Sequence, residues 1–419
     1  MPHNTLAAKE RGRGVIILQN PIALSSTASL LAACLVLIAG ALLTRHVGIL
    51  AKYNIPEPIV GGVVFAILVA VLGATTGMRV SLDVPARSPL LLLFFACVGM
   101  TADMRLLSQG GARLLRFLIV LLPFLFVQDA LGVAVARGLG LHPLLGLVAG
   151  SITLVGGHGT GAAYAQRFAD VNNIQGVMGL TMTSATLGLV LGGIVGGPVA
   201  QWLIRRYGVQ PAVPATEDAG VGGGPVTTPV TMLAFMGSLA AGLVAMMVGQ
   251  RLAELTEGAV ITVPSFVWCL FVGLAIRNAG PFIGVRLNEA ATELIGAISL
   301  SLFLAWTMMA LDLAGTVRLA GPLLIILVFQ TALVIVWSLF VTFWLVGHDY
   351  EAAVMSAAFC GFAMGATATA IANMQALTRR YGPAPQAFLV VPLCGAFFID
   401  IMNALVLTVF LSLRFIGGG

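Results

Sequence analysis

Charge is scarce in this chain of 419 residues. Asp, Glu, Lys and Arg make up 9% of it and hydrophobic residues 59%, whereas soluble domains carry roughly 25% charged residues. That composition excludes an ordinary soluble protein. The apolar runs, such as 118–136, are continuous and do not alternate as the strands of a membrane barrel do. The sequence therefore predicts an all-α polytopic membrane protein.

Sequence signatures of catalysis are also missing. There is no HExxH motif, no Walker-type phosphate loop, no Gly-x-Gly-Asp and no GxGxxG. The five cysteines have no CxxC spacing and apolar neighbours, which predicts reduced, buried thiols. The net charge of +5 is not gathered into a basic cluster. We expect no enzyme, no organic cofactor and no nucleic-acid partner.

Apolar segments of about 20 residues, the length that crosses a bilayer, recur along both halves of the chain. We expect spans at about 22–44, 57–76, 88–103, 114–137 and 176–204, and again at about 230–251, 263–278, 292–313, 319–346 and 386–412. Residues 1–21 form a predicted N-terminal tail. Residues 205–229 contain Gly222-Gly-Gly-Pro225 and form a predicted flexible linker. The chain thus divides into transmembrane repeats at 22–204 and 230–413.

Two glycine-rich stretches, 150–164 and 356–374, make poor spans. Glycine weakens a helix, and a break inside hydrocarbon leaves backbone groups unsatisfied unless protein or a water-filled cavity surrounds them. We interpret them as re-entrant hairpins at about 142–170 and 350–375 whose tips meet. The sequence aligns Gly157, Gly161 and Ala162 with Gly361, Gly365 and Ala366. Paired interrupted segments of this kind indicate a transporter's binding site.

The order of motifs indicates that the second half duplicates the first. Residues 94–103 resemble 303–312, residues 126–131 resemble 328–333, and Pro56 pairs with Pro264. Chance similarity between Leu/Ala/Val-rich segments is the alternative. An odd number of spans in each half makes the two copies enter the membrane from opposite sides, which is the inverted-repeat plan of secondary transporters.

The hairpins supply the candidate substrate site. Helix N-termini at a glycine turn attract anions, and hydroxyl groups lie nearby. The candidate substrate-binding residues are Ser151, Thr153, Gly156, Gly157, His158, Gly159, Thr160, Gly161, Gly361, Gly365, Ala366, Thr367, Thr369 and Asn373. The alternative, tight helix packing, suits Gly188, Gly192 and Gly196 better. For His158 we expect chiefly a structural role in the turn.

Polar residues inside predicted spans supply a candidate cation site. Asp400 lies in the last span, Asn403 follows one turn later, and Asn373 belongs to the same set. An intramembrane carboxylate usually marks an ion or substrate path, and carboxylate and amide oxygens suit a hard cation. Gln128, Asp129 and Gln330 form a second tier, for which a site and a packing role remain open.

In combination, these motifs resemble the bacterial sodium/glutamate symporter family. The resemblance rests on residues 55–62, 150–163, 299–305, 365–375, 388–392 and 395–405. It implies ten spans, a re-entrant loop between the fourth and fifth spans of each half, periplasmic termini, a homodimer in the inner membrane, and sodium-coupled L-glutamate uptake by an elevator-like moving domain. Lys and Arg in the predicted loops also favour an external N-terminus, although Lys9, Arg11 and Arg13 oppose it.

The resemblance also carries site assignments and departures. The family's motifs map onto residues 156–161 and 361–369, with sodium near Asp400, Asn403 and Asn373; Ser301 is a further candidate. The basic tail, the Gly/Pro linker, and Asp103 and Asp129 in place of amides depart from the family pattern. A carrier of another organic anion such as a dicarboxylate, and a channel or receptor, are the alternative functions.

Overall fold

A computed structural model describes most of the chain. The described residues are 22–52, 55–78, 80–105, 111–174, 176–211, 229–256, 263–284, 286–311, 320–413 and 416. The predicted tail at 1–21 and most of the predicted linker, 212–228, lie outside the described residues.

The first half of the chain forms long helices around a broken hairpin. Outside the hairpin, the helices are α1 (Ser26–His46), the short α2 (Gly48–Lys52), α3 (Glu57–Thr76), α4 (Arg87–Thr101), α6 (Gly111–Gly138) and α9 (Val177–Tyr207). The hairpin between α6 and α9 consists of α7 (Pro143–Leu147), the π-helical η1 (Val148–Ile152) and α8 (Gly157–Asp170). The side chain of Ser25 caps α1 by accepting from the Ala28 N–H. Pro58 lies in the first turn of α3, where its missing N–H is not needed.

The second half repeats this order. It comprises α10 (Met232–Leu255), α11 (Ser265–Ala279), the 3₁₀ turn η2 (Gly280–Ile283), α12 (Glu289–Met309), α14 (Ala320–Trp337), the π-helical η3 (Ser338–Thr342) and α15 (Phe343–Val346). The second hairpin follows as α16 (Tyr350–Met364) and α17 (Thr367–Tyr381), and the chain ends with α18 (Pro385–Leu393), the π-helical η4 (Cys394–Phe398) and α19 (Ile399–Ser412). Pro56 and Pro264 both stand at the N-caps of their helices, α3 and α11.

The all-α prediction is correct apart from one short pair of strands. β1 (Ile22–Leu24) and β2 (Val80–Leu82) pair in parallel, so residues 22–24 are not part of the first span. Two hydrogen bonds beside the strands support this pairing. The Ser26 hydroxyl donates to Asp83, and the Asp83 N–H donates to Ser29 Oγ over 3.1 Å.

Within the described ranges, eight helical segments are long and apolar enough to cross a membrane. They are Ser26–His46, Glu57–Thr76, Gly111–Gly138, Val177–Tyr207, Met232–Leu255, Ser265–Phe282, Glu289–Met309 and Gly321–Val346. The predicted third and tenth spans are not among them. The third, α4, has 15 residues and reaches about 22 Å, while η4 interrupts the tenth. The protein is thus a multi-pass membrane protein, and a count of ten spans remains a prediction.

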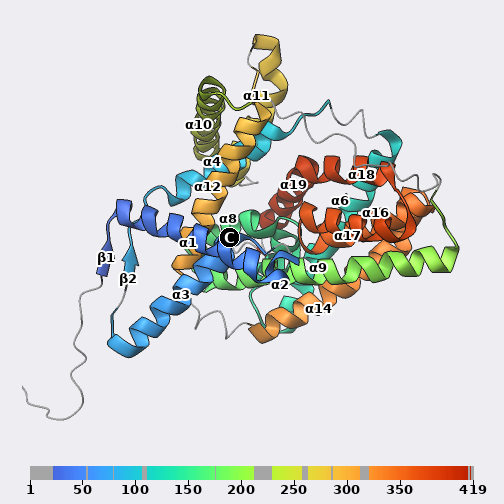
Figure 1. The fold of residues 1–419 in the computed structure, drawn as a ribbon, viewed down its shortest axis with the longest axis horizontal. Helices are drawn as coiled ribbons and strands as arrows, with labels where there is room; N and C mark the ends of the chain where they lie inside the picture. The colour runs from blue at the N-terminus through green and yellow to red at the C-terminus, as the bar shows by residue number, and fades with distance from the viewer. Residues whose placement is uncertain are drawn as a thin grey trace, which may run out of the picture.

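Six helices, three from each half, form what we call the six-helix body. α4 packs against α11 and α12, α1 packs against α3, and α10 packs against α11. Trp306 Nε1 on α12 donates to the Ser29 carbonyl oxygen on α1 over 2.9 Å. These helices occupy the left and upper part of Figure 1.

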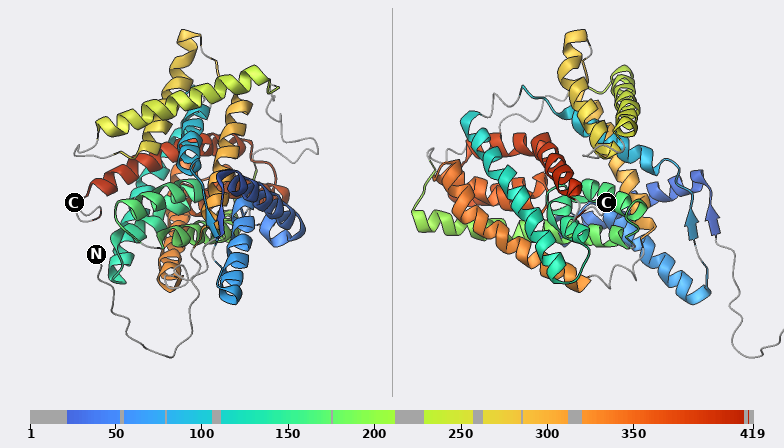
Figure 2. Two further views of the ribbon diagram at one scale, coloured as in Figure 1. Left: turned by 90° about the vertical axis from the view of Figure 1, so that its left-hand side faces the viewer. Right: turned by 180° about the vertical axis from the view of Figure 1, so that it is seen from behind.

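The remaining helices, α6–α9 and α14–α19, form what we call the hairpin body. α9 packs against both arms of the second hairpin, α16 and α17, and α6 packs against α7, α14 and α19. Figure 1 shows this body on the right, and Figure 2 shows it from behind. The main helix contacts between the two bodies are those of α8 with α12 and of η4 with α4.

Ion pairs follow the same division. Arg277 pairs with Asp103 at 3.3 Å and with Glu289 at 3.5 Å within the six-helix body. Arg113 pairs with Asp349 at 2.7 Å within the hairpin body. Each body is therefore tied together internally by its own charges.

Glycines of α9 serve packing, as the sequence predicted. A Cβ on Gly188 would overlap the carbonyl oxygen of Met364, and one on Gly196 would overlap the side chain of Asn373. The prediction of buried, reduced cysteines holds for four of the five; Cys34 is free but exposed on α1.

We predict that a methyl group added at the crossing of α4 and α11 destabilises the six-helix body. A Cβ on Gly99 would overlap the carbonyl oxygen of Leu270, so Gly99→Ala forces these helices apart. Overpacking of this kind typically lowers the unfolding free energy by about 1–3 kcal/mol. Denaturant unfolding in detergent measures it. The matched control is Gly237→Ala on α10, where no atom lies within 4 Å of the added Cβ; equal stability of the two variants would contradict this packing.

Candidate functional site

The two hairpins break at their tips, and the tips meet. α8 begins at Gly157, and α17 begins at Thr367 after Gly365 and Ala366. Gly157 has a φ of 64°, a left-handed conformation that glycine adopts without steric cost. A Cβ at Gly157 would lie 3.8 Å from the Gly365 carbonyl oxygen. The bare backbone of each tip therefore faces the other.

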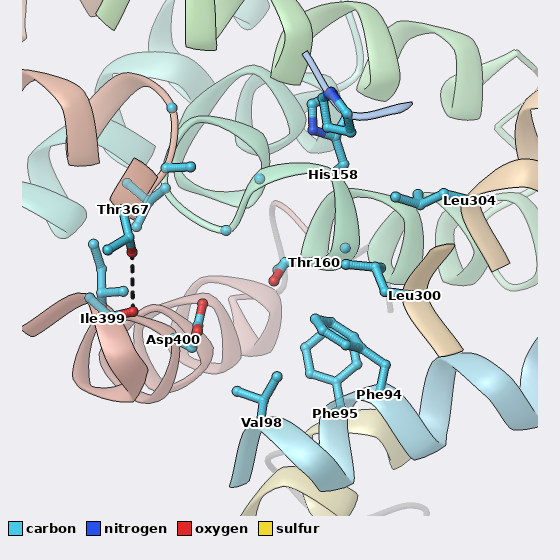
Figure 3. A pocket seen from close by; sticks show the side chains of 18 of the residues that line it. Phe94, Phe95, Val98, His158, Thr160, Leu300, Leu304, Thr367, Ile399 and Asp400 are labelled. Carbon is cyan, nitrogen blue, oxygen red and sulfur yellow. Dashed lines mark hydrogen bonds between the residues drawn. The ribbon is translucent and has the colours of Figure 1, made fainter. Parts of the chain in front are cut away.

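A cavity of about 300 Å³ lies beside the tips, between the two bodies. The candidate residues that line it are Gly156, Gly157, His158, Gly159, Thr160, Ser301, Gly365, Ala366, Thr367 and Asp400. Figure 3 shows Asp400 and Thr367 on one side of this space and Phe94, Phe95 and Val98 of α4 on another. The sequence stretches that predicted a binding site thus line one cavity.

Charge of both signs reaches this cavity. The N-termini of α8 and α17 both start at the tips, and no side chain caps either of them. Their unpaired N–H groups and helix dipoles attract an anion. Asp400 supplies the opposite charge from α19. The arrangement suits a ligand that carries both signs, or an anion accompanied by a cation.

His158 is held within the hairpin body. Its Nε2 lies 3.1 Å from Thr186 Oγ1, and the Thr186 hydroxyl itself donates to the Met182 carbonyl oxygen over 2.8 Å. A hydroxyl has one proton, so the imidazole Nε2–H is the donor to Thr186. In Figure 3 the ring points away from Asp400. These contacts support the predicted structural role of His158.

Several other candidate residues lie outside the cavity lining. Thr153 Oγ1 donates to the Val148 carbonyl oxygen at 2.7 Å and lies 2.8 Å from Ser184 Oγ. Thr369 is buried. A Cβ on Gly161 would press on Thr181, and one on Gly361 would press on Ala370.

This geometry corrects the alignment of the two hairpins. Gly161 and Gly361 lie inside helices and pack the hairpin arms. The pair at the first tip, Gly156 and Gly157, therefore corresponds in position to Gly365 and Ala366. The sequence alignment was out of step because a Gly-x-x-x-Gly spacing occurs in both hairpins, and only the positions of the breaks fix the register.

The three predicted cation ligands have different surroundings. Asp400 lines the cavity. Asn403 Nδ2 donates to the Ser151 carbonyl oxygen over 3.2 Å. Asn373 Nδ2 donates to the carbonyl oxygens of Gly192 and Ala357 at 3.0 and 3.1 Å. Asn373 therefore ties α17 to α9 and α16, away from the cavity lining.

The second-tier residues of the spans form buried hydrogen bonds with neighbouring helices and with the first hairpin. Gln128 Nε2 donates to the Ala363 carbonyl oxygen and Gln330 Nε2 to the Gln128 carbonyl oxygen, each over 2.9 Å. Asp129 Oδ1 accepts from the Ser151 N–H, and Asp129 Oδ2 from the Ser151 hydroxyl, each over 2.8 Å. These buried groups join α6 to both hairpins and α14 to α6.

The sequence analysis missed the wall of the cavity that faces the tips. Phe94, Phe95 and Val98 of α4 and Leu300 and Leu304 of α12 form this wall. Apolar residues on a span carry no local signal that separates a cavity wall from a lipid-facing surface. Only the packing of the two bodies reveals it.

Comparison with known proteins identifies relatives along almost the whole chain. The family model for sodium/glutamate symporters matches residues 22–383. A sodium/glutamate symporter of Escherichia coli K12 is 43% identical over 403 residues, which cover 94% of this chain and 99% of the relative. A sodium/glutamate symporter of Haemophilus influenzae is 41% identical over 390 residues, 92% of this chain and 96% of the relative.

We predict that the tips are reached by water through the cavity. Thr160→Cys and Thr367→Cys, each in a background with the five native cysteines replaced by serine, should react with a membrane-impermeant maleimide added to one side. Thr181→Cys is the control, because Thr181 is fully buried away from the cavity lining. Equal reactivity of the tip cysteines from both sides in every condition, or none from either side, would contradict a gated cavity.

Proposed function

Because the chain belongs to the sodium/glutamate symporter family, we propose that it couples the entry of sodium to the uptake of L-glutamate across a bacterial inner membrane. It is a secondary transporter and not an enzyme. The observation that carries the proposal is the cavity where two uncapped helix N-termini meet a carboxylate.

Glutamate fits that cavity by charge. Its two carboxylates can accept hydrogen bonds from the N–H groups at the starts of α8 and α17. Its ammonium group, or a sodium ion, can pair with Asp400. Because glutamate carries a net negative charge, its transfer into an apolar surrounding is costly. A bound sodium ion offsets that charge, which gives a physical reason for coupling the two.

The division into two bodies supports an elevator-like movement. The ion pairs of Arg113 and Arg277 stay within single bodies, so either body can move as a unit. The cavity wall on the six-helix body is mainly apolar and makes no directional bonds that sliding would break. A hydrogen bond of 3.0 Å from Gln166 on α8 to Ser88 on α4 crosses the boundary. We place the moving substrate site in the hairpin body.

The repeated element order supports inverted repeats. Each half has three helices in the six-helix body and contributes a hairpin and flanking helices to the hairpin body. We retain the predicted repeats at 22–204 and 230–413 and the linker at 205–229 as part of the proposal, although α9 runs on to Tyr207. We further propose a homodimer. A body that moves cannot hold a fixed partner, so we assign the homodimer contact to the six-helix body. We place both termini on the periplasmic side, as the family resemblance implies.

A carrier of dicarboxylates is the second candidate, because the helix N-termini bind carboxylates of any origin. Asp400 favours glutamate where the ammonium group of the substrate, and not a sodium ion, pairs with it, since a dicarboxylate has no ammonium group. A channel is disfavoured because the chain belongs to a family of symporters. Competition by glutamate but not by malate or citrate separates the two carriers.

Uptake in proteoliposomes tests the function. We predict accumulation of labelled glutamate against its gradient only with an inward sodium gradient. Equal uptake on a proton gradient in sodium-free buffer would overturn the proposal. Asp400→Asn should lower sodium-driven uptake roughly 10- to 100-fold, because hydrogen bonds to charged groups contribute about 1.5–3 kcal/mol. Asp170→Asn, at an exposed carboxylate, is the matched control.

His158→Gln should retain substantial uptake, and Thr186→Val should affect transport to a similar extent. The Gln amide can replace the Nε2–H donor that binds Thr186, whereas Val removes the acceptor. Initial uptake rates at several pH values measure this. Complete inactivity of a well-folded His158→Gln protein, with Thr186→Val active, would assign His158 a direct part in transport.

A further inference from the structure

The first hairpin has a second break, well before its tip. Gly150 within η1 has φ −104° and ψ −137°, which is not helical. Asp129 of α6 lies against this break, and a Cβ on Gly150 would be 2.8 Å from Asp129 Oδ1. Glycine is therefore required for the approach of the carboxylate. The break turns the backbone of Ser151 toward Asp129, which accepts from its N–H and its hydroxyl.

Asp129 is a buried carboxyl group without a cationic partner among the described ion pairs. Its side chain is fully buried, and it takes part in none of the ion pairs of the described residues. Both oxygens act as acceptors toward Ser151, which suits the ionised form. A buried charge is costly unless it is paired or binds a metal ion. A carboxylate has about four lone-pair sites, so acceptor capacity remains after the two bonds to Ser151.

Other oxygen atoms near the break also have no partner. Asn403 of α19 donates its Nδ2 to the Ser151 carbonyl oxygen, and this fixes the amide so that Oδ1 is the free end. Asn403 is 1% exposed, and its Oδ1 has no hydrogen-bond partner. The hydroxyl of Tyr164 is likewise buried without a partner and lies within electrostatic range of Asp129. Ser151 thus joins a carboxylate from α6 to an unsatisfied amide oxygen from α19.

We propose that Asp129, the broken backbone of η1 and Asn403 form a sodium site inside the hairpin body, separate from the cavity at the tips. Carboxylate, amide and carbonyl oxygens are the ligands that hard cations take. Unwound carbonyls and the C-terminal ends of half-helices coordinate sodium in discontinuous transporter helices, and α7 ends at this break. The assignment rests on the proposed sodium-coupled function and names where one coupling ion binds.

The position links this ion to the substrate. Asn403 lies one turn after Asp400 on α19, and η1 leads into the first tip. An ion that draws Asp129, η1 and Asn403 together orders α19, which carries Asp400, and the segment that leads into the first tip. Sodium bound here prepares the glutamate site without touching glutamate.

The test is sodium binding and sodium-dependent uptake by Asp129→Asn. The amide keeps an acceptor for the Ser151 N–H and a donor for its hydroxyl, so the local fold survives the loss of charge. Purified protein in detergent is titrated with sodium chloride against choline chloride, without glutamate, and its melting temperature is recorded. Asp129→Asn should shift the half-saturating sodium concentration upward by at least about tenfold, the loss that even an outer-shell partner of a metal typically causes. Asp170→Asn, an exposed carboxylate of the same hairpin, should leave it unchanged.

The outcomes separate the inference from the function. If wild-type uptake needs no sodium, the proposed function fails. If it needs sodium but Asp129→Asn binds sodium as the wild type does, this site alone is wrong. A changed pH dependence of uptake with unchanged sodium affinity would make Asp129 a proton carrier and also overturn the site. Asp129→Glu keeps the charge and should bind sodium with an altered preference for sodium over lithium, which covers the case in which Asp129→Asn does not fold.

Discussion

Broken helices in an apolar layer leave backbone N–H and C=O groups that lipid cannot satisfy. Many of the buried polar side chains of this protein form hydrogen bonds with such groups. Amide side chains bind carbonyl oxygens of the hairpin arms: Gln128 binds that of Ala363, Asn403 that of Ser151, and Asn373 that of Ala357. The N–H groups at the starts of α8 and α17 receive no such cap. Among the described residues, side chains thus bind backbone groups along the hairpin arms, whereas the helix starts at the tips have no side-chain cap, and a ligand completes the pattern there.

Much of this plan could be predicted from sequence because its signals are local. Hydropathy and length located the long helices within a few residues. Glycine clusters located both hairpins, since the cost of glycine in a helix is a property of the residue itself. Thr160 and Thr367 were predicted together because their glycine-rich segments must face protein or water, whereas Asp400 was predicted separately, as an intramembrane carboxylate. The structure brings all three to one cavity.

The rest depends on register between segments far apart in the sequence. The apolar wall at Phe94 and Leu300 has no signature distinct from a lipid-facing surface, and only the contact of the two bodies defines it. Gly361 was aligned with a tip glycine because the same spacing occurs in both hairpins, yet it packs against Ala370 inside the hairpin. The strands at 22–24 and 80–82 are too short to stand out from the apolar runs beside them.

The carboxyl groups of Asp400 and Asp129 lie in different parts of the structure, and this difference bears on coupling. Asp400 lies at the boundary between the bodies, where the cavity opens. Asp129 lies wholly inside the hairpin body, with its bonds to η1. An ion held at Asp129 must travel with the hairpin body, whereas a ligand at the tips is enclosed only while the six-helix body covers it. If the ion is needed to order η1 and α19, an empty ion site leaves the tips poorly shaped for glutamate. Sodium then binds first, at the break inside the moving body, and glutamate binds second, at the tips on its boundary. This order couples the two.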